Sequence, residues 1–344
     1  MKKSVLIIYT GGTIGMVNDP ETGILCPFNF DQITLEVPEI REFDFKIDHY
    51  TLPELIDSSN LSPRLWVDLC RVILEHHEQY HGFVILHGTD TMAYSASALS
   101  FMLDRLGKPV IFTGSQLPIG KIRTDGKENL IAALEIAAAG DPGHPIVPEV
   151  CILFGDRLFR GNRATKINAE SFDAFQSFNY PPLAEIGIRV HYNRDAILPL
   201  PRSPLPPTAF YNLDARVAIL KVFPGLGADV MEAIISVPGL RGIILETYGS
   251  GNAPTHPGFL DNIRAALARG IVIYNVTQCA GGSVAMGQYE TSRELLRSGV
   301  ISGRDITTEA ALCKMMHVLG KCTSIGEIRT QLNSNLRGEI TPDK

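Results

Sequence analysis

Two short apolar runs that each break into glycine constrain the fold of this chain more than any other feature. Residues 5–9 (Val-Leu-Ile-Ile-Tyr) lead into Thr-Gly-Gly-Thr-Ile-Gly at 10–15, and residues 83–86 (Phe-Val-Ile-Leu) lead into His-Gly-Thr-Asp-Thr-Met at 87–92. A continuous apolar run that ends in glycine is typical of a buried parallel strand at its carboxyl end. Ligands bind outside these ends in open α/β sheets, so two threonine hydroxyls placed there predict a ligand site and indicate an enzyme.

Strand and helix patterns alternate along the rest of the chain. Apolar runs predict strands at 109–112, 150–154, 217–222, 242–245 and 271–275, and helical spacing predicts helices at 64–78, 93–106, 125–139, 229–235, 257–268, 308–319 and 325–332. Five prolines within 198–207 predict a stiff, extended linker. We therefore expect two α/β domains. The larger N-terminal one, at 1–197, has a mostly parallel sheet flanked by helices, and a proline-rich linker at 198–212 joins it to a smaller C-terminal one at 213–344.

Composition indicates an ordinary globular protein and argues against several classes of partner. The chain has 344 residues, of which 45% are hydrophobic and 20% charged. Its formal net charge of −6, without a cluster of Lys and Arg, argues against a nucleic-acid binder. The first apolar run is too short to span a membrane and enters Thr-Gly-Gly without a signal-cleavage pattern. Six scattered cysteines without a Cys-x-x-Cys pair indicate reduced thiols, which favours the cytoplasm.

Two glycine-rich segments imitate phosphate-binding motifs without matching them. At 10–15, threonine stands where the first glycine of G-x-G-x-x-G is required. At 114–121, five residues instead of four separate the two glycines, and Ile122 follows the lysine in place of Ser or Thr. Neither segment predicts a phosphate site.

Residues 77–81 read His-Glu-Gln-Tyr-His, which matches the H-E-x-x-H signature of zinc proteases. That signature requires a helix that continues through both histidines, and a third ligand elsewhere. Here Gly82 follows at once and a strand is expected from residue 83, so the helix is expected to end within the motif. We therefore expect solvated side chains at a helix end and no metal.

The second threonine motif has a simpler explanation, which is helix capping. Asp90 and Thr91 could cap the helix expected from residue 93. This alternative does not explain why Thr13 has the same placement after a strand. A threonine hydroxyl needs an adjacent base to act as a nucleophile, and a buried lysine oriented by a carboxylate can supply one. Lys166 is a candidate, although its position alone makes it one lysine among many.

Five motifs in a fixed order make the pattern specific. Besides the two threonine motifs, they are Thr-Gly-Ser-Gln at 113–116, Ala-Thr-Lys-Ile-Asn at 164–168 and Tyr-Gly-Ser-Gly-Asn-Ala-Pro at 248–254. In this order they resemble the bacterial L-asparaginase family. The ending Asn-Leu-Arg-Gly-Glu-Ile-Thr-Pro-Asp at 335–343 is similar to that of its cytoplasmic type I branch. The resemblance covers essentially the whole chain.

This resemblance implies hydrolysis of asparagine to aspartate and ammonia through a threonine acyl-enzyme, without a metal or an organic cofactor. It implies that Thr13 is the first nucleophile. It also groups Thr89, Asp90 and Lys166 as a second triad, in which the lysine activates Thr89 or a water molecule. Backbone N–H groups around Gly88 and Thr89 would hold the oxyanion.

The resemblance also implies contacts with a small amino-acid substrate and with a second subunit. Asp90 would bind the substrate ammonium, and Ser58, with Ser59 beside it, would bind the α-carboxylate. Related enzymes build the site where two subunits meet, which implies a homodimer or a homotetramer. Asn252 would reach the site across that contact. Neither nucleic acid nor a membrane is an expected partner.

Some type I relatives have a regulatory pocket that binds asparagine. By position, Thr165 and Cys279 would fall in that pocket. Glu246 replaces a family arginine that would meet the α-carboxylate there. This reversal of charge argues against allosteric regulation.

A second departure from the family pattern concerns the first nucleophile. The family places a tyrosine on the loop after that threonine, where it helps to activate the hydroxyl. The segment 16–27 contains no tyrosine, and Ile24 and Leu25 stand at the expected position. The sequence therefore leaves open which group activates Thr13.

Two other functions stay open at this point. One is the amidase component of a tRNA-dependent amidotransferase, which shares these motifs but has an extra domain ahead of the first strand, whereas the strand here begins at Val5. The other is a non-catalytic asparagine sensor, which the missing tyrosine suggests. The preference for asparagine or glutamine is also open, because one methylene changes binding by only about 1–3 kcal/mol.

Overall fold

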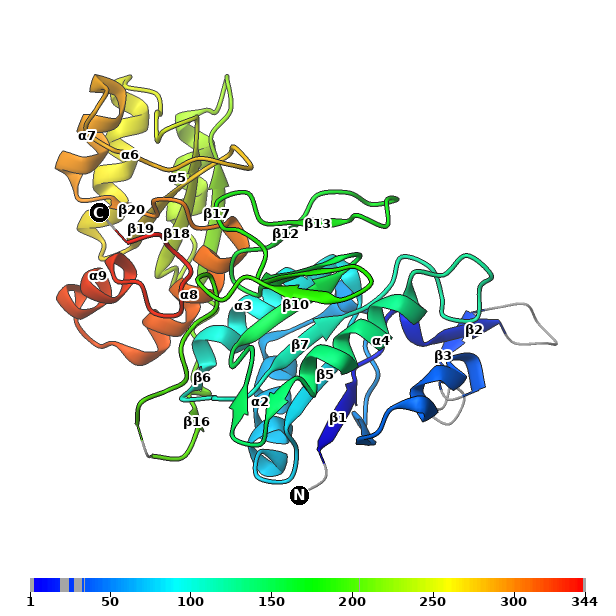
Figure 1. Ribbon diagram of the computed structural model, residues 1–344. Helices are drawn as coiled ribbons and strands as arrows, with labels where there is room; N and C mark the ends of the chain where they lie inside the picture. The colour runs from blue at the N-terminus through cyan, green and yellow to red at the C-terminus, as the bar shows by residue number, and fades with distance from the viewer. Residues whose placement is uncertain (1–2, 19–24, 28–32, 34, 204, 343–344) are drawn as a thin grey trace. The chain divides into compact units, whose positions relative to one another are not determined.

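The computed structural model describes residues 3–18, 25–27, 33, 35–203 and 205–342 (Figure 1). The chain divides into two compact units, Met1–Ala209 and Phe210–Lys344, and the division falls within the proline-rich segment 198–212. Each unit has its own sheet and its own helices. No helix of the described residues is long and apolar enough to cross a membrane.

An eight-stranded sheet forms the centre of the first unit, in the order β15-β14-β11-β10-β7-β5-β1-β4. Its strands are β1 (Ser4–Tyr9), β4 (Lys46–Thr51), β5 (Gly82–Leu86), β7 (Val110–Thr113), β10 (Val150–Phe154), β11 (Arg157–Arg160), β14 (Ala184–Ile186) and β15 (Val190–Tyr192). The five strands from β10 to β4 are parallel, and the other three are antiparallel. This mostly parallel sheet confirms the fold class expected from the apolar runs.

Helices cover both faces of this sheet, which explains why its central strands are almost entirely apolar. The helix α4 (Gly126–Ala137) packs on β5, β7 and β10, and α3 (Met92–Met102) packs against β7 and β10 (Figure 1). The helix α2 (Pro63–His76) packs beside α3. Every residue of β1 and β5 is buried as a result. Burial on both faces is the usual reason for continuous apolar strands.

The helix α3 ends four residues earlier than the expected range 93–106. Leu103 and Asp104 instead form the short strand β6, which pairs with β16 (Thr208–Ala209). Arg105, which follows, has a positive φ of 55° that a helix does not allow. The long-range pairing with β16 therefore ends the helix, although the local pattern favours its continuation.

Short hairpins complete the first unit, and the sequence patterns did not predict them. They are β2 (Met16–Asn18) with β3 (Leu25–Pro27), β8 (Gly140–Asp141) with β9 (His144–Pro145), and β12 (Thr165–Lys166) with β13 (Phe175–Gln176). A short 3₁₀ helix, η2 (Pro38–Glu42), precedes β4. Strands of two or three residues are too short to show a period of two.

The second unit has a four-stranded parallel sheet, in the order β17-β18-β19-β20. Its strands are β17 (Val217–Lys221), β18 (Gly242–Thr247), β19 (Val272–Thr277) and β20 (Ile301–Ser302), and its helices are α5 (Ala228–Ile235), α6 (Pro257–Ala268), α7 (Glu290–Ser298), α8 (Thr308–Lys321) and α9 (Ile325–Asn333). The helix α8 packs on β17, β18 and β19. The sequence did not predict α7, because only Ser292 and Leu295 of its nine residues are buried.

A fully buried ion pair fastens the end of the second unit. Lys314 of α8 lies 2.6 Å from the Glu339 carboxylate, and both side chains are inaccessible to solvent. The ammonium also donates to the carbonyl oxygens of Leu332 and Ser334, at 2.9 and 2.6 Å. The carboxylate accepts backbone N–H groups from the turn that precedes it. The charges are thus paired and hydrogen-bonded, which is the condition for stable burial of charge.

Candidate active site

The carboxyl ends of β1 and β5 are joined by close backbone contacts. The Thr10 hydroxyl donates to the carbonyl of Leu86 at 2.9 Å, and the Thr10 amide donates to the same oxygen. Gly11 and Gly12 then take positive φ values of 111° and 87°. A Cβ on Gly12 would lie 2.5 Å from the backbone nitrogen of Gly88. Only glycine permits this approach, so the glycines bring the two threonine motifs into contact.

Both threonines open short 3₁₀ turns directly after these strand ends. Thr13 begins η1 (Thr13–Gly15) and is half-buried, and Thr89 begins η4 (Thr89–Thr91) and is only 8% exposed. The buried Tyr9 hydroxyl donates to the Gly15 carbonyl at 3.0 Å and so supports the first turn. Burial raises the pKa of this phenol to about 12. The two threonines thus stand on turns at neighbouring strand ends.

Ser58 lies against the same backbone. It begins the turn η3 (Ser58–Asn60), it is buried, and a Cβ on Gly88 would lie 2.4 Å from its Oγ atom. The Thr91 hydroxyl donates to the Ser58 carbonyl at 2.9 Å. Ser59 is exposed, and its backbone N–H donates to the Asp57 carboxylate at 3.0 Å. The expected substrate residues Ser58 and Gly88 are thus neighbours.

Lys166 meets the second threonine motif from a distant part of the chain. It lies on β12, and its Nζ atom is 2.7 Å from Thr89 Oγ1 and 2.7 Å from Asp90 Oδ1. The lysine side chain is 18% exposed and the aspartate side chain 65% exposed. The three predicted residues therefore form one cluster, although Lys166 and Thr89 stand 77 residues apart. A lysine within hydrogen-bond distance of a hydroxyl can accept the hydroxyl proton and give it back. The carboxylate orients the lysine.

This geometry also tests the alternative explanation, in which Asp90 and Thr91 cap the following helix. Thr91 is the N-cap residue of α3, yet among the described residues no side-chain hydrogen bond caps that helix. The Thr91 hydroxyl is directed to Ser58, and the Asp90 carboxylate is directed to Lys166. Capping therefore does not account for Asp90 and Thr91.

Gln116 is a neighbour of this cluster that sequence reasoning did not assign to the site. It follows the carboxyl end of β7, and its Oε1 atom lies 3.4 Å from Thr89 Oγ1. Its backbone N–H donates to the Asp125 carboxylate at 2.9 Å. The signal was available, because Gln116 ends the motif Thr-Gly-Ser-Gln after a third parallel strand.

His87 holds the backbone on which Thr89 stands. Its Nδ1 atom is 2.7 Å from the Gly88 carbonyl, and its Nε2 atom is 2.9 Å from the Ser95 hydroxyl. Since a carbonyl only accepts, Nδ1 carries the proton of the imidazole. Burial lowers the pKa of His87 to about 4, so the ring is neutral near pH 7. His87 therefore positions Gly88.

Two of the other predicted residues, Asn252 and Cys279, lie in the second unit, as does Glu246. Asn252 forms a β-bridge with Tyr248, and its Oδ1 atom accepts the Thr291 hydroxyl at 2.7 Å. Cys279 is exposed. Glu246 lies on β18 and accepts the Thr308 hydroxyl at 2.6 Å.

The roles expected for these residues stay predictions. The same holds for Thr165, which lies in the first unit on β12. The position where the family has its loop tyrosine includes Ile24, which lies outside the described residues.

The H-E-x-x-H motif is divided by the end of a helix. The helix α2 ends at His76, and His77 is its C-cap residue, which confirms that the helix does not continue through both histidines. His77 Nε2 lies 2.7 Å from the Leu106 carbonyl, and His81 Nδ1 accepts the backbone N–H of Ser4 at 2.8 Å. Within the described ranges, no group of three His, Cys, Asp or Glu side chains could hold a metal ion.

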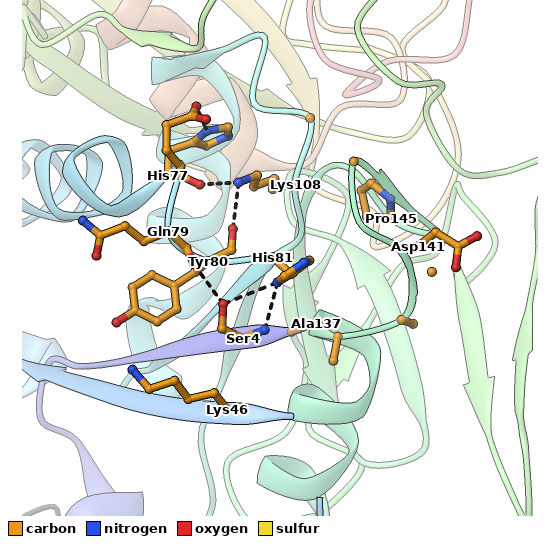
Figure 2. A pocket seen from close by; sticks show the side chains of 16 residues that line it. Ser4, Lys46, His77, Gln79, Tyr80, His81, Lys108, Ala137, Asp141 and Pro145 are labelled. Carbon is orange, nitrogen blue, oxygen red and sulfur yellow. Dashed lines mark hydrogen bonds and ion pairs between the residues drawn. The ribbon is translucent and has the colours of Figure 1, made fainter. Parts of the chain in front are cut away.

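A cavity of about 700 Å³ lies at the opposite, amino ends of the same strands (Figure 2). Figure 2 shows Lys108 directed to the carbonyls of His77 and Tyr80, the second at 2.7 Å. These carbonyls follow the end of α2, so the ammonium caps that helix end. His81 is directed to the start of β1 at Ser4. These polar groups of the cavity thus hold elements of the fold together.

Comparison with known proteins identifies the family to which this chain belongs. That family agrees with the hydroxyls found at the strand ends. Residues 4–198 match the family described as "Asparaginase, N-terminal". Residues 216–332 match the "Glutaminase/Asparaginase C-terminal domain". The chain belongs to the asparaginase family, as the motifs predicted.

Individual relatives cover the whole chain. "L-asparaginase 1" of Escherichia coli K12 is 44% identical over an alignment of 345 positions, which covers 99% of each protein. The crystal structure of L-asparaginase I from Vibrio cholerae has a TM-score of 0.89 and 38% identity, over 99% of this chain and 100% of that one. A component of the glutamyl-tRNA(Gln) amidotransferase of Pyrococcus horikoshii is 35% identical over 98% of this chain and 77% of its own length.

Proposed function

We propose that this protein hydrolyses L-asparagine to L-aspartate and ammonia. The observation that carries the proposal is the contact of Lys166 Nζ with both Thr89 Oγ1 and Asp90 Oδ1, beside the loop that bears Thr13. A hydroxyl, an ammonium and a carboxylate at adjoining strand ends suit nucleophilic attack on an amide. The full-length similarity to L-asparaginase 1 favours asparagine as the amide.

In the first half of the reaction, Thr13 is the nucleophile. Its Oγ atom bonds to the side-chain amide carbon of asparagine, and the carbon–nitrogen bond then breaks. The proton of the Thr13 hydroxyl moves to the leaving nitrogen, which departs as ammonia and leaves an ester on Thr13. In the second half, a water oxygen bonds to the ester carbon, a water proton returns to Thr13, and aspartate is released. Thr89 and Lys166 carry these protons because they are in hydrogen-bond contact.

The same cluster supplies groups that suit a zwitterionic amino acid. The exposed Asp90 carboxylate can accept the substrate ammonium, and Ser58 Oγ can donate to the α-carboxylate. The backbone N–H groups of Gly88 and Thr89 lie at the start of a 3₁₀ turn, where they can donate to the oxyanion. This scheme uses side chains, backbone groups and one water molecule, and it needs no cofactor.

Two further features belong to the proposal. The protein acts in the cytoplasm, which fits the scattered cysteines and the resemblance to type I enzymes. It works as a homodimer or homotetramer in which Asn252 of one copy reaches the site of another. Size measurement in solution, with the Asn252→Ala variant assayed beside the wild type, checks both statements about assembly.

The deciding experiment measures ammonia release from asparagine by Thr13→Ala and Thr89→Ala. Each substitution is expected to lower kcat by about a thousandfold or more, because it removes a group that bonds to or protonates the reacting atoms. Thr51→Ala, at an exposed position at the end of β4, is the matched control. Near-normal turnover in both variants would refute the mechanism.

The same assay separates the alternative functions. Tight binding of asparagine without ammonia release by the wild type would identify a sensor. The second alternative is the amidase component of a tRNA-dependent amidotransferase, and the similarity to such a component is the reason to test it. Ammonia release that requires a tRNA-bound substrate would identify that activity. A parallel series with glutamine measures the preference between the two amides.

A further inference from the structure

We propose that Gln116 is a positioning residue that fixes the direction of the Thr89 hydroxyl proton. The inference rests on the proposed function, in which Thr89 and Lys166 carry protons. It follows from three contacts of one side chain and its neighbour. Gln116 Oε1 faces Thr89 Oγ1 at 3.4 Å, Gln116 Nε2 donates to the Ser171 carbonyl at 3.0 Å, and Lys166 Nζ faces Thr89 Oγ1 at 2.7 Å.

The contact with Ser171 fixes which end of the amide faces Thr89. A carbonyl oxygen only accepts, so the group that points to Ser171 must be the NH₂ end of Gln116. The Asn168 carbonyl lies at 3.5 Å from the same nitrogen and has the same requirement. The oxygen end of Gln116 is therefore the end that faces Thr89, and the hydrogen-bond network determines this assignment.

The orientation of Gln116 in turn fixes the direction of the hydroxyl. An amide oxygen only accepts, so the Thr89 hydroxyl donates its proton to Gln116. The lone pairs of Thr89 Oγ1 then face Lys166, which donates to them. In the resting site the proton order is thus Lys166 to Thr89 to Gln116. At 3.4 Å the last bond is long and weak, so the hydroxyl can leave Gln116 for a substrate atom at small cost.

Gln116 is itself held firmly from the backbone side. The Asp125 carboxylate accepts the N–H groups of Gln116 and Leu117, at 2.9 and 3.1 Å. Asn129 donates to Asp125 and to the Gly114 carbonyl, so the first turn of α4 supports the whole segment. The Gln116 side chain therefore stands on a firmly held backbone segment, which allows its amide to direct the Thr89 hydroxyl.

The contact with Ser171 gives Gln116 a second role. Ser171 lies between β12, which carries Lys166, and β13. Gln116 thus joins the segment after β7 to the hairpin of Lys166, so that one side chain positions both partners of the proton transfer. The two roles use opposite ends of the amide, and substitutions can separate them.

The test compares Gln116→Met with Gln116→Glu in steady-state ammonia release. Methionine has a similar length but neither an acceptor for Thr89 nor a donor to Ser171. We expect its kcat to fall by about tenfold with KM within about twofold of the wild type, because proton direction matters in the reaction and not in binding. Glutamate keeps an acceptor facing Thr89, and we expect it to restore kcat to within about threefold of the wild type.

The controls keep the inference distinct from the proposed function. Gln79→Met, an exposed position at the far ends of the strands, should leave both constants unchanged, and melting temperatures should confirm that all variants fold. An inactive wild type would refute the proposed function. An active wild type with a normal kcat in Gln116→Met would overturn the role of Gln116. Equal losses of kcat in both variants, together with a raised KM, would also overturn the assigned role in proton direction. They would indicate that Gln116 only holds the hairpin of Lys166 in place.

Discussion

The two ends of the parallel strands in the first unit each hold a lysine in hydrogen bonds, but the two lysines have different partners. At the carboxyl ends, Lys166 contacts a hydroxyl and a carboxylate. At the amino ends, Lys108 contacts two backbone carbonyls at the end of α2 (Figure 2). A hydroxyl can lose, gain and redirect a proton, whereas a carbonyl of the backbone can only accept. The partners of a lysine, and not the size of the cavity beside it, therefore indicate reactivity.

The most direct challenge to this contrast is to make the same substitution at both ends. Lys166→Met should lower kcat for asparagine by about a thousandfold, because proton transfer by a positioned group contributes a factor of this order. The melting temperature should change little, because the Asp90 carboxylate that loses its partner is 65% exposed and stays hydrated. Ammonia release under saturating substrate measures the effect. A loss of less than tenfold would contradict the assigned role of Lys166.

A second prediction uses the histidines of the two ends. Burial lowers the pKa of His87 at the carboxyl end to about 4, and burial also lowers the pKa of the more exposed His81 at the amino end. Because the unfolded chain has a histidine pKa near 6.5, it binds a proton between pH 6.5 and 4 that folded His87 does not. The contribution of His87 to the free energy of unfolding is therefore fully present above pH 6.5. It is lost as the pH falls towards 4, and the loss amounts to about 3 kcal/mol.

Urea unfolding at a series of pH values measures this loss. His87→Gln should flatten the dependence between pH 6.5 and 4 markedly, and His81→Gln should flatten it much less. His317, whose pKa burial also lowers to about 4, contributes a similar slope from the second unit and serves as an internal reference. An unchanged slope in His87→Gln would show that this residue does not titrate as proposed.

The weakest effect should come from Lys108. Lys108→Met removes the ammonium that caps α2 and leaves the His77 and Tyr80 carbonyls without it, which should cost about 1–2 kcal/mol of the free energy of unfolding. Since the cavity lies at the far ends of the strands, kcat and KM should stay at the wild-type values. Chemical unfolding and the ammonia assay together check the prediction. A tenfold loss of kcat would instead tie the amino ends to the reaction.

Much of the first unit could be predicted from local patterns. The central strands β1, β5, β7 and β10 are buried throughout and almost entirely apolar because helices cover both faces, and this signal is strong in any window of five residues. Elements with few buried residues were missed. The strands β12 and β13 have two residues each, and α7 buries two side chains.

The candidate site was predicted unevenly. Thr13 and Thr89 follow from their places after strands, whereas Lys166 became specific only through the resemblance of its motif to a family. Gln116 was not assigned to the site. Its motif places it after a third parallel strand, but nothing local to residue 116 indicates that its amide lies between Thr89 and the hairpin of Lys166. Contacts of this kind depend on strand order, which a sequence pattern does not contain.

The order of the amino acids is enough to specify the chemical groups of this protein and the strand ends on which they stand. Burial patterns and glycines are local, so they are legible along the chain. Which groups meet depends on the folded arrangement of the strands. The parallel order β7-β5-β1 brings the turns after three strands to one edge, and the hairpin of β12 then places Lys166 beside a threonine 77 residues away. Hydrogen bonds join groups that are close in space, and their proton directions follow from all the partners together.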